Sequence, residues 1–365
     1  MGYRVGILGG GQLARMMVLA AKPLGVEVSC YEPSPSLCTT GLCEVIQGDY
    51  QEVDKITAWA SKQNIITYEN ENIPLELAKL LEDKHTLNPG AKALYYCQDR
   101  LYEKQLCQDL SIPTAQFVTI DNQEDLSRAE EILGYPFVVK TRRLGYDGKG
   151  QFLIKSPNDL LSLSQQLPEV PLIAEKFIQY SHEVSIISAT NSKETVFYPL
   201  AKNYHEKGIL KTSTAPLFDD DLTLQAQTIA KHFIETLNYV GTLAIEFFVV
   251  DGKLFVNELA PRVHNSGHWS IDGAVTSQFE NHIRAILNMP LGSTEAVSNT
   301  VMINCLGKMP PSDQVLVYSN AKLHDYQKSP RPGRKLGHIN LIEASETPLT
   351  SCASALLKVV DNPTI

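Results

Sequence analysis

The N-terminal segment carries the pattern that most restricts how this chain can fold. An apolar run over residues 3–8 is broken by three glycines at 9–11, a helical pattern follows over 12–22, and a second apolar run covers 26–31. A strand, a glycine turn, a helix and a second strand in this order form a βαβ unit, because neighbouring parallel strands need a crossover connection. The pattern therefore predicts an α/β domain of the Rossmann-like kind at the N-terminus.

Turn signals further along the chain indicate where the next domains begin. The turn Asn88-Pro89-Gly90 closes the first pattern, so we place the first domain at residues 1–103. Short β-rich runs then alternate with polar helical stretches, which predicts a mixed α+β domain over residues 104–293. Short strands and Pro-rich turns follow, and predict a small β-rich domain over residues 294–365. A chain of 365 residues is long enough for three such domains.

Charge and cysteine content limit the partners of the chain. The formal net charge is −9, whereas nucleic-acid binding normally needs a basic face, so we expect no nucleic-acid partner. The seven cysteines have no C-x-x-C spacing, so we expect neither a disulfide framework nor a zinc site, and a reducing, cytoplasmic compartment. The first apolar run is too short for a signal peptide and no run approaches a spanning helix, so we expect no targeting segment and no membrane partner.

The glycine turn of the βαβ unit is open to more than one interpretation. Residues 9–14 fit the spacing G-x-G-x-x-A, and Glu32 lies near the end of the next strand, where an acid can bind a ribose. Read alone, this pattern suggests a NAD- or FAD-dependent oxidoreductase. The same N–H groups at a helix N-terminus suit any anion, and the glycines could also serve only a tight turn. The pattern therefore favours an anion site over a specific dinucleotide site.

A second glycine-rich segment indicates polyphosphate binding. Lys140 ends an apolar run, and residues 145–151 read GYDGKGQ. Glycine lets the backbone approach phosphates, and a lysine at a strand end adds a point charge. The P-loop spacing is absent, and on its own the segment would be a solvated hairpin. Residues 175–178 follow another apolar run, where the backbone could pair with an adenine while Glu183 binds a ribose, although surface acids are about as common there.

Two glutamates suggest a metal site. Glu246 and Glu258 each interrupt an apolar strand, so both need partners. The turn signal Asp251-Gly252 separates the strands, but a two-residue loop would place Glu246 opposite Asn257. A three-residue loop over 250–252 would bring both glutamates to one face, where they could bind magnesium. We therefore predict the three-residue loop and the shared face.

The segment after Glu258 is dense in donors for anions. Arg262 beside a magnesium site is best interpreted as a clamp on a transferring phosphoryl group, and otherwise as a member of a buried ion pair. His264 and His268 have the spacing of a helical metal pair, but Pro261 and Gly267 favour a loop, so we do not predict zinc.

Five blocks in order span nearly the whole chain and read GGGQLARM, YPFVVKTRRLGYDGKGQ, FYPLAKNYHEKGIL, NELAPRVHNSGHW and RPGRKLGHINL. Together they resemble one family of ATP-grasp enzymes, the 5-(carboxyamino)imidazole ribonucleotide synthases. The resemblance implies a three-domain ATP-grasp architecture with a mobile lid at about residues 112–182. It implies that ATP activates bicarbonate as carboxyphosphate and that the amine of 5-aminoimidazole ribonucleotide takes the carbon, in purine biosynthesis. It also implies magnesium as a cofactor and a homodimer.

The resemblance implies the residues of the site as well. For magnesium these are Glu246 and Glu258, and for catalysis Asp147, Arg262 and Lys335. The expected ATP-binding residues are Arg100, Lys140, Gly145, Tyr146, Asp147, Gly148, Lys149, Gly150, Gln151, Glu175, Lys176, Phe177, Ile178, Glu183, His205, Asn257 and Glu258. The expected ribonucleotide-binding residues are Gly11, Gln12, Leu13, Glu71, Tyr146, Asp147, Arg262, His264, Asn265, Ser266, Lys328, Arg331, Arg334 and Lys335.

Three other functions remain as alternatives. A formate-using glycinamide ribonucleotide transformylase shares the glycine-rich flap, but the blocks RPGRK and NSGHW disfavour it. An NAD-dependent oxidoreductase would rest on residues 9–14 alone. A catalytically silent nucleotide-binding scaffold would not need Lys140, Glu246, Glu258 and Arg262 together.

Overall fold

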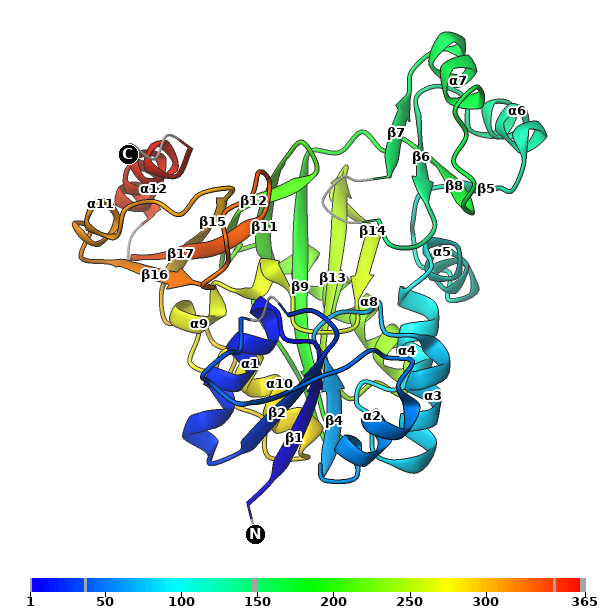
Figure 1. The fold of residues 1–365 in the computed structure, drawn as a ribbon. Coiled ribbons are helices and arrows are strands. Elements are labelled where there is room, and N and C mark those ends of the chain that lie inside the picture. Colours follow the sequence, from blue (N-terminus) through cyan, green and yellow to red (C-terminus); the bar gives the residue numbers. More distant parts are fainter. Residues whose placement is uncertain (1, 36–37, 146–149, 344–345, 362–365) are drawn as a thin grey trace.

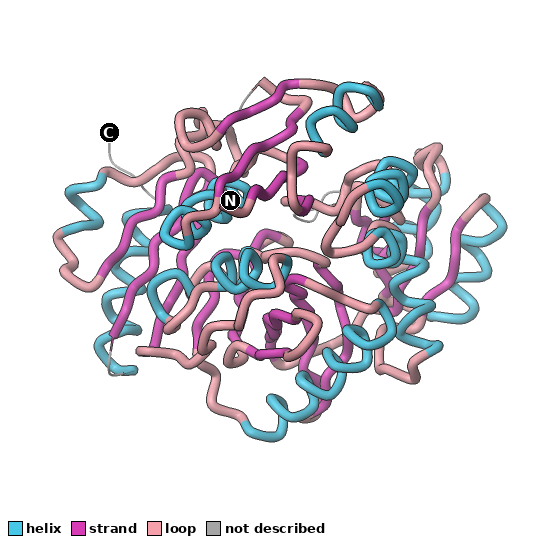
Figure 2. Tube along the Cα trace, turned by 90° about the horizontal axis from the view of Figure 1, so that it is seen from below, coloured by secondary structure: helices cyan, strands magenta, loops and turns pink. Residues whose placement is uncertain are grey.

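A computed structural model describes residues 2–35, 38–145, 150–343 and 346–361, which form three sheets with flanking helices (Figure 1). Seen from below, most helices lie toward the outside and most strands toward the middle (Figure 2). Among the described residues, no helix is long and apolar enough to cross a membrane.

The first sheet is parallel and confirms the predicted βαβ unit. Its order is β3-β2-β1-β4, and α1 (Gln12–Ala21) connects the two central strands. The strands are β1 (Arg4–Leu8), β2 (Glu27–Glu32), β3 (Glu44–Gln47) and β4 (Ile65–Tyr68). The helices that follow are α2 (Val53–Ala60), α3 (Leu75–Lys84), α4 (Ala91–Cys97) and α5 (Arg100–Asp109).

Both faces of this sheet are covered by apolar side chains. Helices α2 and α3 cover one face, where Trp59 and Leu81 pack in the cluster that contains Leu8. Helix α1 covers the other face together with α10 (Gln278–Ile286), which comes from much later in the chain and contributes Phe279. Because α10 is part of this core, the central part of the chain is fixed against the N-terminal sheet.

The second sheet forms the lobe at the upper right of Figure 1. Its order is β5-β8-β6-β7, and all of its pairs are antiparallel. It comprises β5 (Phe117–Ile120), α6 (Gln123–Leu133), β6 (Phe137–Thr141), β7 (Gln151–Ile154), α7 (Pro157–Ser164) and β8 (Leu172–Lys176). The two helices pack on the sheet to form a small core of their own.

The third sheet has nine strands within the described ranges and follows the order β14-β13-β9-β11-β12-β15-β17-β16, with β10 beside β9. Its first part comprises β9 (His182–Thr190), β10 (Thr195–Phe197), β11 (Ala201–Glu206), β12 (Ile209–Ala215), α8 (Asp220–Leu237), β13 (Gly241–Val250), β14 (Lys253–Ala260), η2 (Asn265–Gly267) and α9 (Ser270–Gly273). Its second part comprises β15 (Asn299–Leu306), α11 (Ser312–Leu316), β16 (Ala321–Asp325), β17 (Lys335–Glu343) and α12 (Glu346–Asp361). Because β12 pairs with β15, one sheet runs from the central part into the C-terminal part.

Candidate active site

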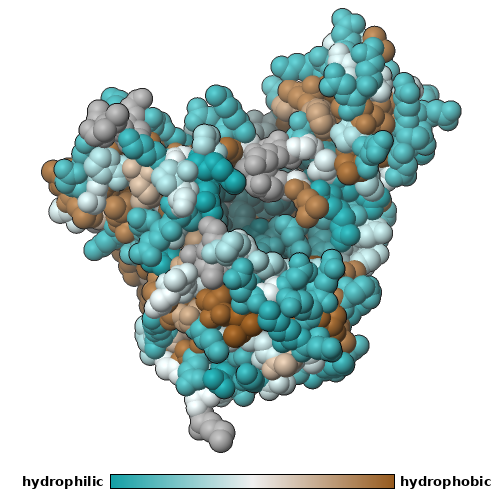
Figure 3. Space-filling model, in the orientation of Figure 1, coloured by the Kyte–Doolittle hydropathy of each residue, from teal (hydrophilic) through white to brown (hydrophobic). Residues whose placement is uncertain are grey.

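A cavity of about 560 Å³ lies where the three sheets approach one another. Figure 3 shows a hollow with hydrophilic walls near the middle of this face. Twenty of the predicted site residues line it: Gln12, Leu13, Glu71, Arg100, Lys140, Gly145, Gln151, Glu175, Lys176, Phe177, Ile178, Glu183, His205, Glu246, Asn257, Glu258, Arg262, His264, Asn265 and Lys335. We call this space the central cavity.

Other predicted residues lie away from its walls. Gly11, Gly150, Ser266, Lys328, Arg331 and Arg334 do not line the central cavity. The ring of His264 contacts Ser266 Oγ, which is fully buried, and Lys328 Nζ donates to Gln12 Oε1, so Ser266 and Lys328 each contact a residue that does line it. Arg331 is exposed, and Arg334 binds the carbonyl of Ser329. Tyr146, Asp147, Gly148 and Lys149 lie outside the described residues.

The two glutamates share one face, as predicted, but the predicted loop is wrong. The turn between β13 and β14 has two residues, Asp251 and Gly252, with φ of 48° and 73°. Positive φ at both positions is the requirement of a tight hairpin turn that matches the twist of the strands. The extra residue lies instead at Asn257, because Phe247 pairs with Val256 while Glu246 pairs with Glu258. This β-bulge restores the shared face that a two-residue loop alone would forbid.

A buried lysine that the sequence analysis missed stabilises this bulge. Lys104 of α5 is 1% exposed, and its Nζ donates to the carbonyls of Val256 at 3.2 Å and Asn257 at 2.7 Å. Its neighbour Glu103 accepts a hydrogen bond from the backbone N–H of Leu259 at 2.8 Å. Helix α5 therefore contacts the backbone on both sides of Glu258. In the sequence, Glu103 and Lys104 are only two adjacent charged residues. Such a pair cannot be distinguished from two solvated charges on the surface of a helix.

Lys104 also belongs to a cluster of buried charges. Glu175 Oε2 lies 2.9 Å from Lys140 Nζ and 3.9 Å from Lys104 Nζ. Burial opposes ionisation of Glu175, but these two ammonium groups outweigh it and lower its pKa to about 2. Burial raises the pKa of Glu103 to about 7, although the charge of Lys104 opposes this increase. The cluster connects β6 and β8 of the lobe to the bulge in β14.

A second ionic group lies farther along the wall. Glu183 Oε2 lies 2.6 Å from His205 Nδ1, and Glu183 Oε1 accepts a hydrogen bond from the Tyr180 hydroxyl at 2.6 Å. The ring of Tyr180 stacks on Phe248 with centroids 4.5 Å apart. Burial opposes protonation of His205, but its contact with the Glu183 carboxylate outweighs burial and raises its pKa. Glu183 thus has a fixed orientation at a partly apolar end of the central cavity.

Arg262 forms a buried ion pair in the wall of the central cavity. Its guanidinium binds the carboxylate of Glu71 through Nε and Nη2. Burial disfavours the Glu71 carboxylate, but the charge of Arg262 outweighs burial and lowers its pKa. The ion-pair interpretation of Arg262 is therefore confirmed, whereas its role as a clamp on a phosphoryl group stays a prediction for a residue that lines the central cavity. His264 follows in the same segment, and burial beside Arg262 and Lys335 lowers its pKa well below the usual value, so the ring is neutral.

The glycine turn near the N-terminus already binds carboxylates of the protein. Glu69 is 8% exposed and accepts hydrogen bonds from the N–H groups of Gly11 at 2.6 Å and Ala14 at 3.0 Å. Glu32 accepts one from Gly10 N at 2.6 Å. A Cβ on Gly11 would lie 2.7 Å from a Glu69 oxygen, so this position requires glycine for close approach. The oxidoreductase interpretation is disfavoured, because the protein's own glutamates occupy the donors that a dinucleotide would need.

Three protein families match successive parts of the chain. The ribonucleotide synthetase preATP-grasp domain matches residues 2–98, the ATP-grasp domain matches residues 105–279, and the phosphoribosylaminoimidazole carboxylase C-terminal domain matches residues 300–351. With the fold and the central cavity, these matches define the chain as an ATP-grasp enzyme.

Relatives and solved structures specify the family further. The N5-carboxyaminoimidazole ribonucleotide synthase of Pseudomonas aeruginosa is 43% identical over 93% of this chain and 94% of its own length. The crystal structure of the synthetase from Thermus thermophilus superposes with a TM-score of 0.94 at 42% identity, over 98% of this chain and 99% of that one. A synthase from Aspergillus clavatus in complex with ADP and 5-aminoimidazole ribonucleotide superposes with a TM-score of 0.91 at 27% identity, over 99% of both chains. The chain belongs to the family of N5-carboxyaminoimidazole ribonucleotide synthases, as the resemblance implied.

Replacing Lys104 by Met tests whether the buried cluster supports the site. The change leaves Glu103 without its cation and removes the donor to the bulge, so we expect the free energy of unfolding to fall by about 3–5 kcal/mol. Urea denaturation measures this loss, and ATP binding by the variant should be weaker.

The control is Lys79→Met, because Lys79 is half exposed and pairs with Glu76 at the surface. Its effect should stay within about 0.5 kcal/mol. Equal stability of the two variants would contradict the role given to Lys104.

Proposed function

We propose that this carbon-nitrogen ligase uses ATP and bicarbonate to carboxylate the amine of 5-aminoimidazole ribonucleotide, with ADP and phosphate as the other products. The observation that carries the proposal is the convergence of the lobe, the paired glutamates and the C-terminal strands on one cavity. Lys140, Glu246, Glu258 and Lys335 all line it. The proposal is supported by solved relatives described as complexes with ATP, with ADP, and with ADP and 5-aminoimidazole ribonucleotide.

The proposed reaction has two steps. A bicarbonate oxygen attacks the γ-phosphorus of ATP, the bond to the β-phosphate oxygen breaks, and carboxyphosphate and ADP form. The amine nitrogen then bonds to the carbon, the carbon–oxygen bond to phosphate breaks, and the amine loses a proton. Carboxyphosphate is short-lived in water, so a closed cavity formed by several parts of the chain suits this chemistry.

For ATP, we propose that the adenine contacts the backbone of residues 175–178 and that Glu183 binds the ribose. Lys140, at the end of β6, would contact the phosphates, together with the glycine-rich segment 145–151 and Arg100. His205 would act through Glu183, because its ring contacts that carboxylate.

We propose residues 1–103, 104–293 and 294–365 as the domains, with a lid over about 112–182.

Magnesium fits the paired glutamates. Burial raises the pKa of Glu246 to about 7, and the charge of Glu258 adds to this increase, although His205 and Lys335 oppose it. Arg100 Nη2 lies 3.8 Å from Glu258 Oε2, so one cation of the protein is within ion-pair distance of the two glutamates. Among the described residues no group of three or more metal-binding side chains gathers, so phosphate oxygens would complete the coordination. Magnesium bound there would neutralise charge on the transferred phosphoryl group.

For the ribonucleotide, we propose contacts with Arg262, His264, Asn265 and Lys335. Arg262 is oriented by Glu71, and a neutral His264 can accept or donate a hydrogen bond. Gln12 and Leu13 would contact the ribonucleotide directly. Gly11 and Ser266 would support the residues that contact it, and Lys328 would act through its hydrogen bond to Gln12. Arg331 and Arg334 would meet the phosphate from outside the cavity. Asp147, which lies outside the described residues, remains our proposal for the group that orients the amine.

We also propose a cytoplasmic location and a homodimer. The seven cysteines are free thiols, in keeping with a reducing cytoplasm. The homodimer rests on the family resemblance, and light scattering on the purified protein would measure its mass.

The pH dependence of stability tests the environment of Glu246. A glutamate whose pKa rises from 4.5 to about 7 on folding stabilises the folded protein below pH 4.5, and this contribution is lost as the pH rises through 7. The ligand-free protein should therefore lose up to about 3 kcal/mol from this residue between pH 4.5 and 7. Glu246→Gln should lack that loss when unfolding is followed at several pH values. An unchanged pH profile in the variant would show that Glu246 titrates normally.

Release of ADP with each co-substrate varied tests the function. We expect turnover only when ATP, bicarbonate and 5-aminoimidazole ribonucleotide are all present. Turnover with glycinamide ribonucleotide and formate at an equal rate would overturn the assignment in favour of the transformylase.

A further inference from the structure

Two cysteines of the N-terminal domain lie side by side, away from the central cavity. Cys30 is in β2, and Cys43 lies directly before β3. Cys30 is in register with Val45, so Cys43, two residues earlier, projects from the same face of the sheet. The two Sγ atoms are 3.6 Å apart. From this geometry we infer that Cys30 and Cys43 form a reversible disulfide when the protein meets hydrogen peroxide.

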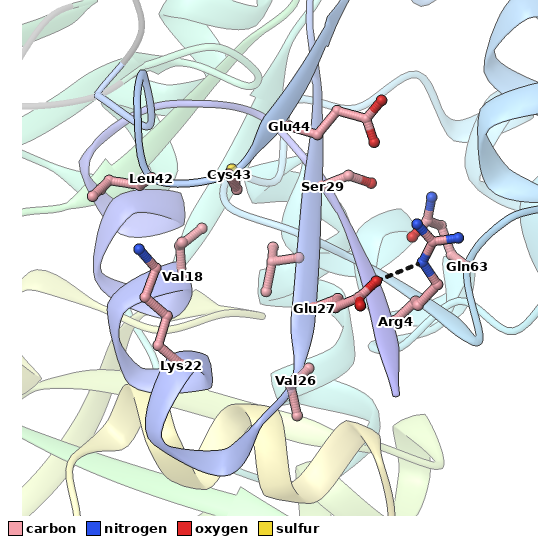
Figure 4. Close-up of a pocket in the computed structure, with 11 residues that line it drawn as sticks. Arg4, Val18, Lys22, Val26, Glu27, Ser29, Leu42, Cys43, Glu44 and Gln63 are labelled. Atoms are coloured by element: carbon pink, nitrogen blue, oxygen red, sulfur yellow. Dashed lines mark ion pairs between the residues drawn. The ribbon is translucent and has the colours of Figure 1, made fainter. Parts of the chain in front are cut away.

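The two thiols differ in access to solvent. Cys30 is 0% exposed, whereas Cys43 is partly exposed. Cys43 lines a second cavity of about 290 Å³, together with Val18, Lys22 and Ser29 (Figure 4). A small oxidant therefore reaches Cys43 first, and Cys30 only through Cys43.

The environments of the two thiols indicate the same order of reaction, with Cys43 before Cys30. The hydrogen bond with the Cys30 thiol and the nearby charge of Lys22 outweigh burial and lower the pKa of Cys43. The same hydrogen bond, together with burial, raises the pKa of Cys30 well above the usual value. The thiolate is the nucleophilic form of cysteine, so Cys43 is the group that attacks and Cys30 the group that resolves.

The chemistry balances with peroxide as the oxidant. The Cys43 thiolate attacks one peroxide oxygen, the oxygen–oxygen bond breaks, and hydroxide leaves, which produces a sulfenic acid on Cys43. The Cys30 sulfur then attacks Cys43 Sγ as its proton is released, the sulfur–oxygen bond breaks, and the oxygen leaves as water. Two thiols and one hydrogen peroxide thus give one disulfide and two water molecules, and a dithiol reductant reverses the change.

The disulfide closes the part of the chain that fixes the glycine turn. Glu32 accepts a hydrogen bond from Gly10 N, and Cys38 N donates to Gly10 O at 2.8 Å. Both residues lie between Cys30 and Cys43 in the sequence. Oxidation therefore ties together the two ends of the segment that contacts this turn, which lies beside Gln12 and Leu13 in the wall of the central cavity.

Peptide mapping of the full chain tests the inference. The reduced protein is treated with a small excess of hydrogen peroxide, blocked with an alkylating agent and digested without reductant. We expect one linked peptide that contains Cys30 and Cys43 and is two hydrogens lighter than the sum of its parts. When isotopically light and heavy protein are mixed before oxidation, links should form only within one label, which excludes links between molecules. Full alkylation of both cysteines after peroxide treatment would overturn the inference.

Single variants test the order of attack. Cys30→Ser should leave a sulfenic acid on Cys43 that a dimedone probe labels, whereas Cys43→Ser should abolish both the label at this site and the linked peptide. Cys352→Ser is the matched control, since Cys352 is also partly exposed and lies in helix α12, remote in sequence from Cys30 and Cys43. Its linked peptide should equal that of the wild type. If Cys30→Ser does not fold, the wild-type map alone decides, because it needs no variant.

Discussion

The contact between Lys104 and the β-bulge at Asn257 is the constraint on which the geometry of the site depends. Without one extra residue in β14, the alternation of side chains would direct Glu246 and Glu258 to opposite faces. A bulge leaves backbone groups without ladder partners, and Lys104 Nζ satisfies the carbonyls of Val256 and Asn257. A buried ammonium is costly unless it is paired, and Glu103 and Glu175 supply the opposite charge. The position of a carboxylate pair in one sheet is thus determined by a helix that precedes it by about 150 residues.

Several charged side chains of the central cavity pair with one another. Glu175 pairs with Lys140, Glu71 pairs with Arg262, and Glu183 pairs with His205. Each pair orients a side chain before ligand arrives, so less conformational freedom remains to be lost on binding. Glu246 and Glu258 differ, because they lie opposite each other, and burial together with the charge of Glu258 raises the pKa of Glu246. That difference is the reason why we propose a divalent cation there, with the phosphates beside it.

Patterns of local sequence predicted the parts of the structure that depend on local rules. The βαβ unit follows from apolar periodicity and three glycines, and the shared face of the two glutamates follows from the need of buried acids for partners. The loop was mispredicted because a hairpin can correct its register at a bulge as well as at its turn, and no local signal distinguishes the two. Glu69 and Lys104 were missed because their burial depends on elements far away in sequence. The substrate was inferred from family resemblance, since donors for anions alone do not specify a ribonucleotide.

The central claim is that bicarbonate is activated by phosphorylation in the cavity where its carbon is transferred. Bicarbonate labelled with heavy oxygen tests this directly, with mass analysis of the phosphate released during turnover. Attack of bicarbonate on the γ-phosphorus leaves one bicarbonate oxygen on the phosphorus, so the account predicts one labelled oxygen in each phosphate. Unlabelled phosphate, at the same rate of carbamate formation, would contradict the account, because ATP would then be cleaved without activating bicarbonate.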